Sequence, residues 1–235
     1  MAESVIPLPP GRRVVIITGH YGSGKTEFAV SLALALAAVE REFPRLALID
    51  LDIANPYFRS RERRALLEGA GVSVYGSLYR DEITAELPAL GAAARAPLQD
   101  AGCLTLVDAG GNDSGALVLN QFRKDFPPGA TAVLAVVNAS RPETASAEGA
   151  VRHIRAIESV TGLNVEYIVN NCHLLRETTV GTIRRGHELC ERVCEATGKL
   201  LLCDCYPAPV VRAGDVSGIG ERVFPLGLYM RETWQ

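Results

Sequence analysis

The sequence predicts an α/β fold in which a mainly parallel, twisted β-sheet is flanked by helices on both faces, giving three layers. Two observations lead to this prediction. Short apolar runs alternate with helix-forming segments from Arg12 to about Asp204, without a break that would mark a domain boundary. The short runs are apolar throughout, which is typical of parallel strands that are covered on both sides.

The length and composition of the chain indicate one compact domain. The chain has 235 residues, of which 48% are hydrophobic, enough to bury a substantial core. We expect residues 12–235 to form a single domain and the proline-rich residues 1–11 to be a flexible N-terminal segment. The net charge is -3, so the composition gives no indication of nucleic-acid or membrane binding. The sequence has no recognisable secretion signal or membrane span, so we expect a cytoplasmic protein.

The first half of the chain begins with a β-branched run, Val14–Ile17, which ends in a glycine-rich turn and predicts a buried strand. Alanine, leucine and glutamate then predict a helix over Lys25–Arg41. Leu46–Asp50 is a second apolar run that ends on an acidic residue, and Val72–Tyr75 is expected to be a short strand. Glu82–Ala94 has a helical composition, although its central proline should kink or divide a helix.

The second half of the chain predicts two helices and four further strands. Pro142 suits the first turn of a helix over Glu143–Ser159. A second helix is expected over Thr178–Thr197, with an interruption near Gly186. The apolar runs that predict strands are Leu104–Val107, Ala132–Val137, Val165–Val169 and Leu200–Cys203.

Polar residues stand at the carboxyl ends of several predicted strands. Asp50, Asp108, Asn138 and Asn170 each end or follow an apolar run. In open parallel sheets, ligands bind beyond the carboxyl ends of the strands. The sequence therefore predicts that these side chains share one site.

A glycine-rich motif follows the first strand. Residues Gly19–Thr26, Gly-His-Tyr-Gly-Ser-Gly-Lys-Thr, match the P-loop pattern in full, which makes the predicted fold that of a P-loop NTPase. Glycines let the backbone wrap around phosphates, and the helix that follows adds the positive end of its dipole. Lys25 is expected to reach the β- and γ-phosphates, and the Thr26 hydroxyl to ligate magnesium. The predicted nucleotide-binding residues here are Gly19, His20, Tyr21, Gly22, Ser23, Gly24, Lys25, Thr26 and Glu27.

Acidic residues after two other strands predict a metal site. Asp108 ends a strand and is followed by Ala-Gly-Gly, so it can hold magnesium through water, while the N–H of Gly111 faces the γ-phosphate. The spacing of Asp50 and Asp52 places both carboxylates on one side of an extended strand. One of them would tune the water shell of the metal, and the other would position the attacking water. The predicted metal-binding residues are Thr26, Asp50 and Asp108.

The order of these motifs resembles a known group of proteins. A P-loop, then Asp-x-Asp after the second strand, then Asp-x-x-Gly after a later one is similar to the MinD/ParA/Mrp and nitrogenase-iron-protein group of ATPases, which includes enzymes like dethiobiotin synthetase and cobyrinate amidase. The resemblance spans Arg12 to about Pro209. The segment Asp50–Arg59 is also similar to a bacterial branch described only as ATP-binding.

The resemblance implies roles for matching positions. Asp52 falls where the group has its water-positioning aspartate, so the implied catalytic residues are Lys25, Asp52 and Asp108. Asn170 falls where relatives carry an asparagine that recognises adenine, and Pro207 lies in the loop that closes over the base. A guanine-specific Asn-Lys-x-Asp pattern is absent after Val169, which favours ATP over GTP.

One departure from the group concerns His20. ParA-like members carry a lysine at this position that reaches the nucleotide of a dimer partner. Histidine is shorter and largely neutral at cytoplasmic pH, so we predict that dimerisation alone does not switch on hydrolysis. Arg59, close after the first acidic pair, is a candidate internal source of positive charge.

We therefore predict an ATPase that uses Mg²⁺ and acts as a nucleotide-dependent switch on an unidentified protein partner, in cofactor or metal maturation, as a homodimer. Two alternatives remain: a small-molecule kinase or ATP-dependent ligase resembling dethiobiotin synthetase, and a nucleotide-binding regulatory module without turnover. The six cysteines show no zinc-binding spacing, so we expect them to pack as small apolar residues.

Overall fold

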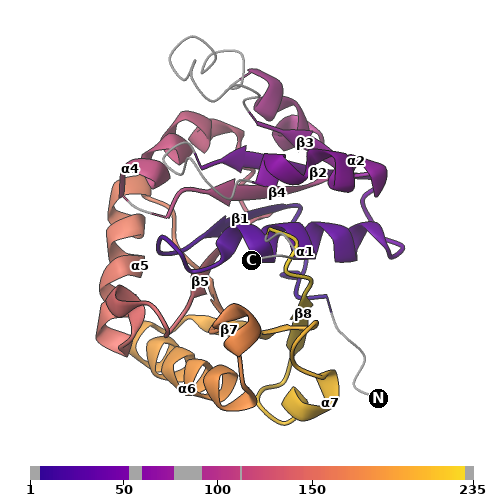
Figure 1. Cartoon of the computed structure of the whole chain (residues 1–235). Coiled ribbons are helices and arrows are strands. Elements are labelled where there is room, and N and C mark those ends of the chain that lie inside the picture. Colours follow the sequence, from indigo (N-terminus) through magenta and orange to yellow (C-terminus); the bar gives the residue numbers. More distant parts are fainter. Residues whose placement is uncertain (1–5, 53–59, 77–91, 112, 231–235) are drawn as a thin grey trace.

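The computed structural model describes residues 6–52, 60–76, 92–111 and 113–230. The described residues form an eight-stranded sheet whose neighbours are all parallel, in the order β3-β2-β4-β1-β5-β6-β7-β8 (Figure 1). This result confirms the predicted α/β fold class. The strands are β1 Val14–Thr18, β2 Arg45–Leu51, β3 Ser73–Tyr75, β4 Cys103–Ala109, β5 Thr131–Val137, β6 Tyr167–Asn170, β7 Leu200–Pro207 and β8 Val223–Leu226.

Helices connect the strands and cover the sheet. The α-helices are α1 Lys25–Ala37, α2 Arg64–Gly69, α4 Asp113–Ala116, α5 Ala147–Thr161, α6 Val180–Thr197 and α7 Ala213–Val216, with a further helix over residues 92–99. Short 3-10 segments are η1 Ser60–Arg63, η2 Leu117–Asp125, η3 Pro142–Thr144 and η4 Leu175–Glu177. None of the helices in these described segments combines the length and the apolar character needed to cross a membrane.

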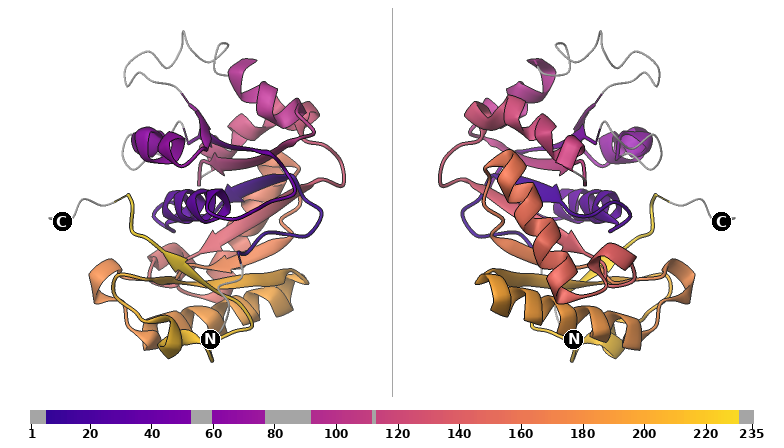
Figure 2. Two further views of the ribbon diagram at one scale, coloured as in Figure 1. Left: turned by 90° about the vertical axis from the view of Figure 1, so that its right-hand side faces the viewer. Right: turned by 90° about the vertical axis from the view of Figure 1, so that its left-hand side faces the viewer.

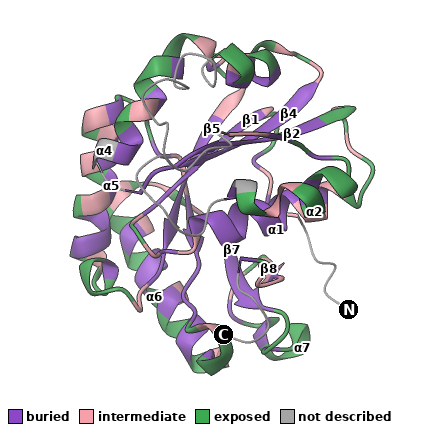
Figure 3. Cartoon of the chain, turned by 45° about the horizontal axis from the view of Figure 1, so that its top comes forward, coloured by how far each residue is buried: buried purple, intermediate pink, exposed green. Residues whose placement is uncertain are grey.

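The sheet separates two apolar cores, one on each face. Val15 and Ile17 of β1 pack with α1 and α2, whereas Val14 and Ile16 pack with α5, α6 and the helix over residues 92–99. Figure 2 shows the sheet between these two helical layers. Figure 3 shows the strands buried and the outer faces of the helices exposed. The alternation along β1 explains why its sequence is apolar from Val14 to Ile17.

The C-terminal segment adds a strand that the sequence did not predict. Val223–Leu226 pairs with Asp204–Pro207 of β7, and Phe224 meets Phe28 of α1 edge to face, with ring centroids 5.8 Å apart. This cover explains why α1, which begins at the P-loop lysine, is buried on nearly all sides.

Several predicted boundaries differ from the structure. The first helix ends at Ala37, and the helix predicted from Glu143 is divided into η3 and then α5, which Ser146 caps through Gly149 N–H. The predicted interruption of α6 is wrong, because the helix runs through Gly186. A side chain at Gly186 would collide with Asn170 and Cys172, so the glycine serves close packing. Most of the helix predicted over residues 82–94 lies outside the described residues.

The described part of the N-terminal segment contacts the domain. Ile6 and Leu8 pack against the core on the α1 face of the sheet, and Pro7 and Pro9 are buried. The proline-rich composition led us to expect a flexible segment over residues 1–11. Composition alone does not show that the apolar residues between the prolines pack against the core of the domain.

Candidate nucleotide-binding site

The P-loop follows β1, the strand that lies between β4 and β5 near the middle of the sheet. Gly19, Gly22 and Gly24 have φ angles of 147°, 75° and 83°, which residues with side chains rarely adopt. Gly24 in this conformation starts α1. A side chain there would also collide with the amide of Asn171. The loop conformation therefore depends on these glycines, as a phosphate-binding loop requires.

Lys25 and Asp52 form a buried ion pair at the end of this loop. Lys25 Nζ lies 2.9 Å from Asp52 Oδ2, and each side chain is 4% exposed. The Asp52 backbone N–H donates to Asp50 Oδ1, at 3.1 Å, which fixes the chain just after β2. The predicted phosphate-binding lysine is thus paired with the predicted catalytic aspartate. A nucleotide phosphate would compete with Asp52 for Lys25.

Asp108 is buried beside this pair. It stands opposite Asp50 in the register of β4 and β2 and is 0% exposed. Burial and the negative charges of Asp50 and Asp52 together raise its pKa to about 8, although Lys25 and the Thr26 hydroxyl act in the opposite direction. Both carboxylate oxygens lack a close hydrogen-bond partner among the described residues. Such a carboxylate is stabilised by a cation.

These residues fit a magnesium ion. Thr26 provides a hydroxyl, and Asp50 and Asp108 provide carboxylates, which are the oxygen ligands that Mg²⁺ prefers. The His, Cys, Asp and Glu side chains of the described segments form no group of three that could enclose a metal. Mg²⁺ usually keeps several waters and is held by one or two carboxylates together with substrate phosphates.

Gly111 lies against the P-loop backbone. A side chain at this position would collide with the carbonyl of Gly19 and would approach the backbone of His20 and Tyr21 to 3.0 Å. The turn that follows Asp108 is therefore packed on the loop expected to hold the phosphates. This contact joins two motifs that are about ninety residues apart in the sequence.

The His20 ring contacts its own chain. Its Nδ1 lies 2.8 Å from the carbonyl oxygen of Tyr21, and its Nε2 lies 3.9 Å from Glu143 Oε2. The ring also meets His153 of α5 edge to face, at 5.0 Å between centroids. The imidazole thus lies toward η3 and α5, while the neighbouring Tyr21 side chain is 58% exposed.

Asn170 differs from its predicted role. It is 0% exposed, and its amide donates to the Ile183 carbonyl at 3.1 Å and to Asp204 Oδ1 at 2.6 Å. Its oxygen accepts from the N–H of Cys172. These bonds tie β6 to β7 and α6, so the amide is not presented to an adenine base.

The neighbouring Asn171 is the residue that reaches the P-loop. Its amide donates to the carbonyl of Ser23, at 2.8 Å. The sequence contains the pair Asn-Asn at this strand end, and the resemblance alone directed attention to the first of them. One register step decides which side chain points toward the loop.

Glu27 and Pro207 also lie differently from the prediction. The Glu27 carboxylate accepts hydrogen bonds from the backbone N–H groups of Tyr229 and Met230, both at 2.8 Å. It thus holds the C-terminal segment and does not face the phosphate loop. Pro207 is buried as the last residue of β7, and its carbonyl accepts from Val210 and Val211, which leaves the exposed residues 208–210 to form the loop beyond the strand.

The cysteines are all free thiols, and five of the six are buried. Burial raises the pKa of Cys190 well above its ordinary value and that of the half-buried Cys194 to about 11. A thiol with a raised pKa is a poor nucleophile, so these residues pack as small apolar groups.

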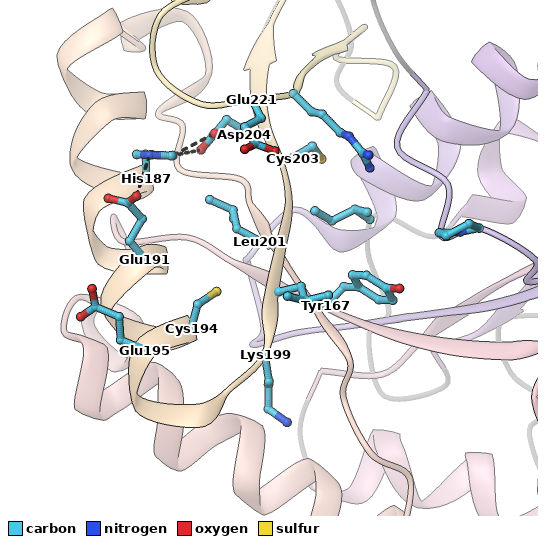
Figure 4. Close-up of a pocket in the computed structure, with 14 residues that line it drawn as sticks. Tyr167, His187, Glu191, Cys194, Glu195, Lys199, Leu201, Cys203, Asp204 and Glu221 are labelled. Atoms are coloured by element: carbon cyan, nitrogen blue, oxygen red, sulfur yellow. Dashed lines mark hydrogen bonds and ion pairs between the residues drawn. The ribbon is translucent and has the colours of Figure 1, made fainter.

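A cavity of about 640 Å³ lies between α6 and β7, and no P-loop residue lines it (Figure 4). His187 lies at its wall, with Nδ1 2.9 Å from Asp204 Oδ2 and Nε2 3.5 Å from Glu191 Oε1. Asp204 in turn accepts from Asn170. His187 thus links Glu191 of α6 to Asp204 of β7, at the sheet end near Asn171.

Comparison with known proteins shows similarity in fold. No family model and no curated protein matches the chain. Among solved structures, Signal Recognition Particle 54 kDa protein from Aeropyrum pernix K1 in complex with GDP matches with a TM-score of 0.51 and 21% identity, over 85% of this chain and 42% of that one. FtsY from Mycoplasma mycoides matches with a TM-score of 0.52 and 17% identity, over 81% and 59%.

The chain has the fold of a P-loop NTPase. A nucleotide-binding protein from Archaeoglobus fulgidus in complex with ADP is a weaker match, with a TM-score of 0.41 and 16% identity over 68% of this chain and 65% of that one. The chain spans about half the length of the two stronger neighbours. At these identities the similarity shows the fold alone.

Proposed function

We propose that this protein binds ATP with Mg²⁺ and hydrolyses it slowly, as a nucleotide-dependent switch acting on a protein partner. The observation that carries the proposal is the buried Lys25–Asp52 ion pair beside Asp108, at the end of a complete P-loop. A lysine and three carboxylates buried at one point are costly in a chain without ligands. A magnesium nucleotide would supply an anion for Lys25 and a cation for Asp108.

The residues of this site would divide the work as follows. The P-loop N–H groups and Lys25 would bind the phosphates and stabilise the charge that develops on them. Bound Mg²⁺, held by Thr26 and through water by Asp50 and Asp108, would neutralise phosphate charge. When Lys25 turns to phosphate, Asp52 loses its ion pair. Its carboxylate then becomes available to position the attacking water.

The same exchange would couple hydrolysis to shape. Asp52 follows β2 directly, and Gly111 packs on the P-loop, so both strand ends respond to the state of Lys25 and the phosphates. Release of phosphate would restore the Lys25–Asp52 pair and return the end of β2 to the arrangement described above. Such order changes at strand ends are how nucleotide switches alter a partner surface.

ATP is favoured over GTP by the residues near Gly24. Guanine is recognised through a carboxylate that accepts from its N–H groups, yet Asn171, Cys172, His173 and Leu174 provide none. The backbone of Gly24 lies against Asn171 and His173, so this stretch borders the site. Adenine places no such demand on the protein.

A protein partner is favoured by apolar side chains around the site. Tyr21, Leu174 and Val210 are 58%, 45% and 37% exposed, and they follow the carboxyl ends of β1, β6 and β7. Exposed aromatic and aliphatic side chains contribute to an interaction surface where they form one patch. We propose that the partner binds at this edge, that the chain forms a homodimer, and that it works in the cytoplasm.

The experiment that tests this function combines two measurements. Mass spectrometry identifies any nucleotide retained during purification, and a phosphate-release assay compares ATP with GTP, with and without Mg²⁺. We expect bound adenine nucleotide and slow, Mg²⁺-dependent release from ATP. Lys25→Ala should remove both properties in a folded chain, because the lysine is paired with Asp52 at the end of the P-loop and is not part of the apolar core.

Other outcomes would change the proposed function. Preference for GTP would overturn the base assignment. Release that starts only when a metabolite is added would indicate a small-molecule kinase or ATP-dependent ligase. Tight nucleotide binding without turnover, even with cell extract added, would indicate a regulatory module.

A further inference from the structure

A rigid turn follows β5 and faces the P-loop. The Asn138 side chain accepts from the N–H of Ser140 at 2.9 Å, and its carbonyl accepts from Arg141 N–H at 3.2 Å. The Thr144 hydroxyl donates to the same carbonyl, at 2.7 Å, and Pro142 fixes the backbone after Arg141. The turn is therefore pre-organised before any ligand binds.

This turn places Arg141 on the phosphate-binding loop. Arg141 Nε donates to the carbonyl of Gly22, at 2.8 Å. The guanidinium lies so close to Gly22 that a side chain there would stand 3.2 Å from Nε. Neither terminal nitrogen of Arg141 has a hydrogen bond or ion pair with any described residue, and the side chain is exposed. Nε thus anchors the guanidinium group, and the two terminal nitrogens remain to bind a ligand.

The site needs a further cation. Lys25 is shared with Asp52, and His20 is occupied with Tyr21, Glu143 and His153 of its own chain. A triphosphate gains negative charge on its outer oxygens during transfer, and fixed cations near those oxygens speed the reaction. An arginine suits this task, because it is always charged and its planar fork matches phosphate oxygens.

We propose that Arg141 is a catalytic residue that contacts the γ-phosphate of the nucleotide bound to the same chain. The proposal rests on the proposed function and deepens it. The anchor on Gly22 holds the guanidinium at the loop that wraps the phosphates, so little side-chain freedom is lost on binding. The chain supplies in this way the positive charge that His20 does not supply.

The test compares Arg141→Gln and Arg141→Lys with Arg155→Gln. Arg155 is an exposed arginine of α5 without a contact to the P-loop, so it controls for the loss of one surface charge. ATP and ADP affinities are measured by calorimetry, and turnover by phosphate release. We expect Arg141→Gln to weaken ATP binding about tenfold or more and turnover about a hundredfold. ADP affinity should change less than about threefold, because ADP lacks the contacted phosphate.

The remaining variants complete the comparison. Arg141→Lys should keep part of the ATP preference and lose most of the turnover, and Arg155→Gln should match the parent. Equal losses of ATP and ADP affinity would show that Arg141 only supports the loop. Unchanged turnover would overturn the proposal, and so would an Arg141→Gln chain that does not fold. A parent protein that binds neither nucleotide would instead refute the proposed function, and this inference with it.

Discussion

At the scale of single residues, the site is built from charges that are in conflict without a ligand. Asp50 and Asp108 face each other across two strands, and Asp108 has a pKa raised to about 8 by burial and by its acidic neighbours. Lys25, which is paired with Asp52, offsets part of this charge. Sites that keep such strain are usually functional, since packing alone would favour apolar residues.

The first residue-scale prediction concerns Asp52. Asp52→Asn removes the charge that pairs with Lys25 but keeps the size of the side chain. ATP affinity should stay equal or rise, because the lysine is freed, while turnover should fall about a hundredfold through loss of the water-positioning carboxylate. Calorimetry and phosphate release measure the two effects. If turnover persists at the parent rate, Asp52 is no more than a tether for Lys25.

A pH prediction concerns Asp204. Burial raises its pKa above the ordinary 3.8, Asn170 and His187 lower it, and Glu191 raises it slightly. The folded state therefore holds the proton more tightly than the unfolded state. The stability from this group is complete below about pH 4 and is lost as the pH rises through the folded-state pKa.

The measurement compares the free energy of unfolding of the parent with that of Asp204→Asn, by urea denaturation between about pH 3.5 and about pH 8. The difference in free energy of unfolding, parent minus Asp204→Asn, should decrease as the pH rises over that interval and should then become constant. An advantage that increases with pH would mean that the contacts with His187 and Asn170 favour the charged form more than burial opposes it.

At the scale of elements, the sequence was informative where one local pattern decides the outcome. β1 and the P-loop were predicted within a residue, because a β-branched run and a complete glycine motif need no tertiary context. The sequence did not predict β8, whose Phe224 and Leu226 are separated by the turn-favouring Pro225. Its pairing depends on β7, which only the folded chain provides.

The site residues also divide into those that a local sequence pattern predicted and those that depend on tertiary contacts. Asp50 and Asp108 lie on neighbouring strand ends, as the strand-end argument predicted, and the motif residues Lys25 and Asp52 are paired beside them. Asn171 and Arg141 were not among the predicted site residues, because neither belongs to the P-loop or acidic motifs and both reach the P-loop through tertiary contacts. Sequence patterns describe neighbours along the chain, whereas these two bonds join residues more than a hundred positions apart.

An element-scale prediction concerns the contact of α1 with the C-terminal segment. Glu27→Ala leaves the N–H groups of Tyr229 and Met230 without acceptors, which should lower the free energy of unfolding by about 2–4 kcal/mol. Glu27→Gln, which keeps one acceptor oxygen, should cost about half as much. Urea denaturation measures both variants.

The same variants distinguish two roles for Glu27. The structure predicts that Glu27→Ala binds ATP with nearly the parent affinity at temperatures where it stays folded. A stable Glu27→Ala chain with much weaker ATP binding would return this carboxylate to the nucleotide site, where the sequence first put it.

At the scale of the whole molecule, the strand order explains how distant residues form one site. β1 lies between β4 and β5, so the P-loop is next to the turn after Asp108 on one side and the turn carrying Arg141 on the other. The next strands on either side are β2, which is followed by Asp52, and β6, which is followed by Asn171, and both side chains reach the P-loop. The crossover of the chain at β1 is therefore what gathers the charges, as in other open α/β sheets.

The last prediction asks whether one chain is sufficient for hydrolysis. His20 is engaged with Tyr21, Glu143 and His153 of its own chain, and Arg141 is already at the P-loop. A single copy therefore holds a positive charge at its own P-loop, without a contribution from a second copy. We predict slow phosphate release whose rate per chain stays constant as protein concentration is raised, even where a dimer forms. His20→Lys should introduce a concentration dependence, because a longer, permanently charged side chain reaches beyond its own chain.

Turnover measured over about a thousandfold range of protein concentration, with the molecular mass measured in parallel, tests this prediction. A steep rise for the parent that His20→Ala abolishes would show that histidine itself acts across the dimer. A rise that His20→Ala leaves intact would show that another residue of the second copy completes the site.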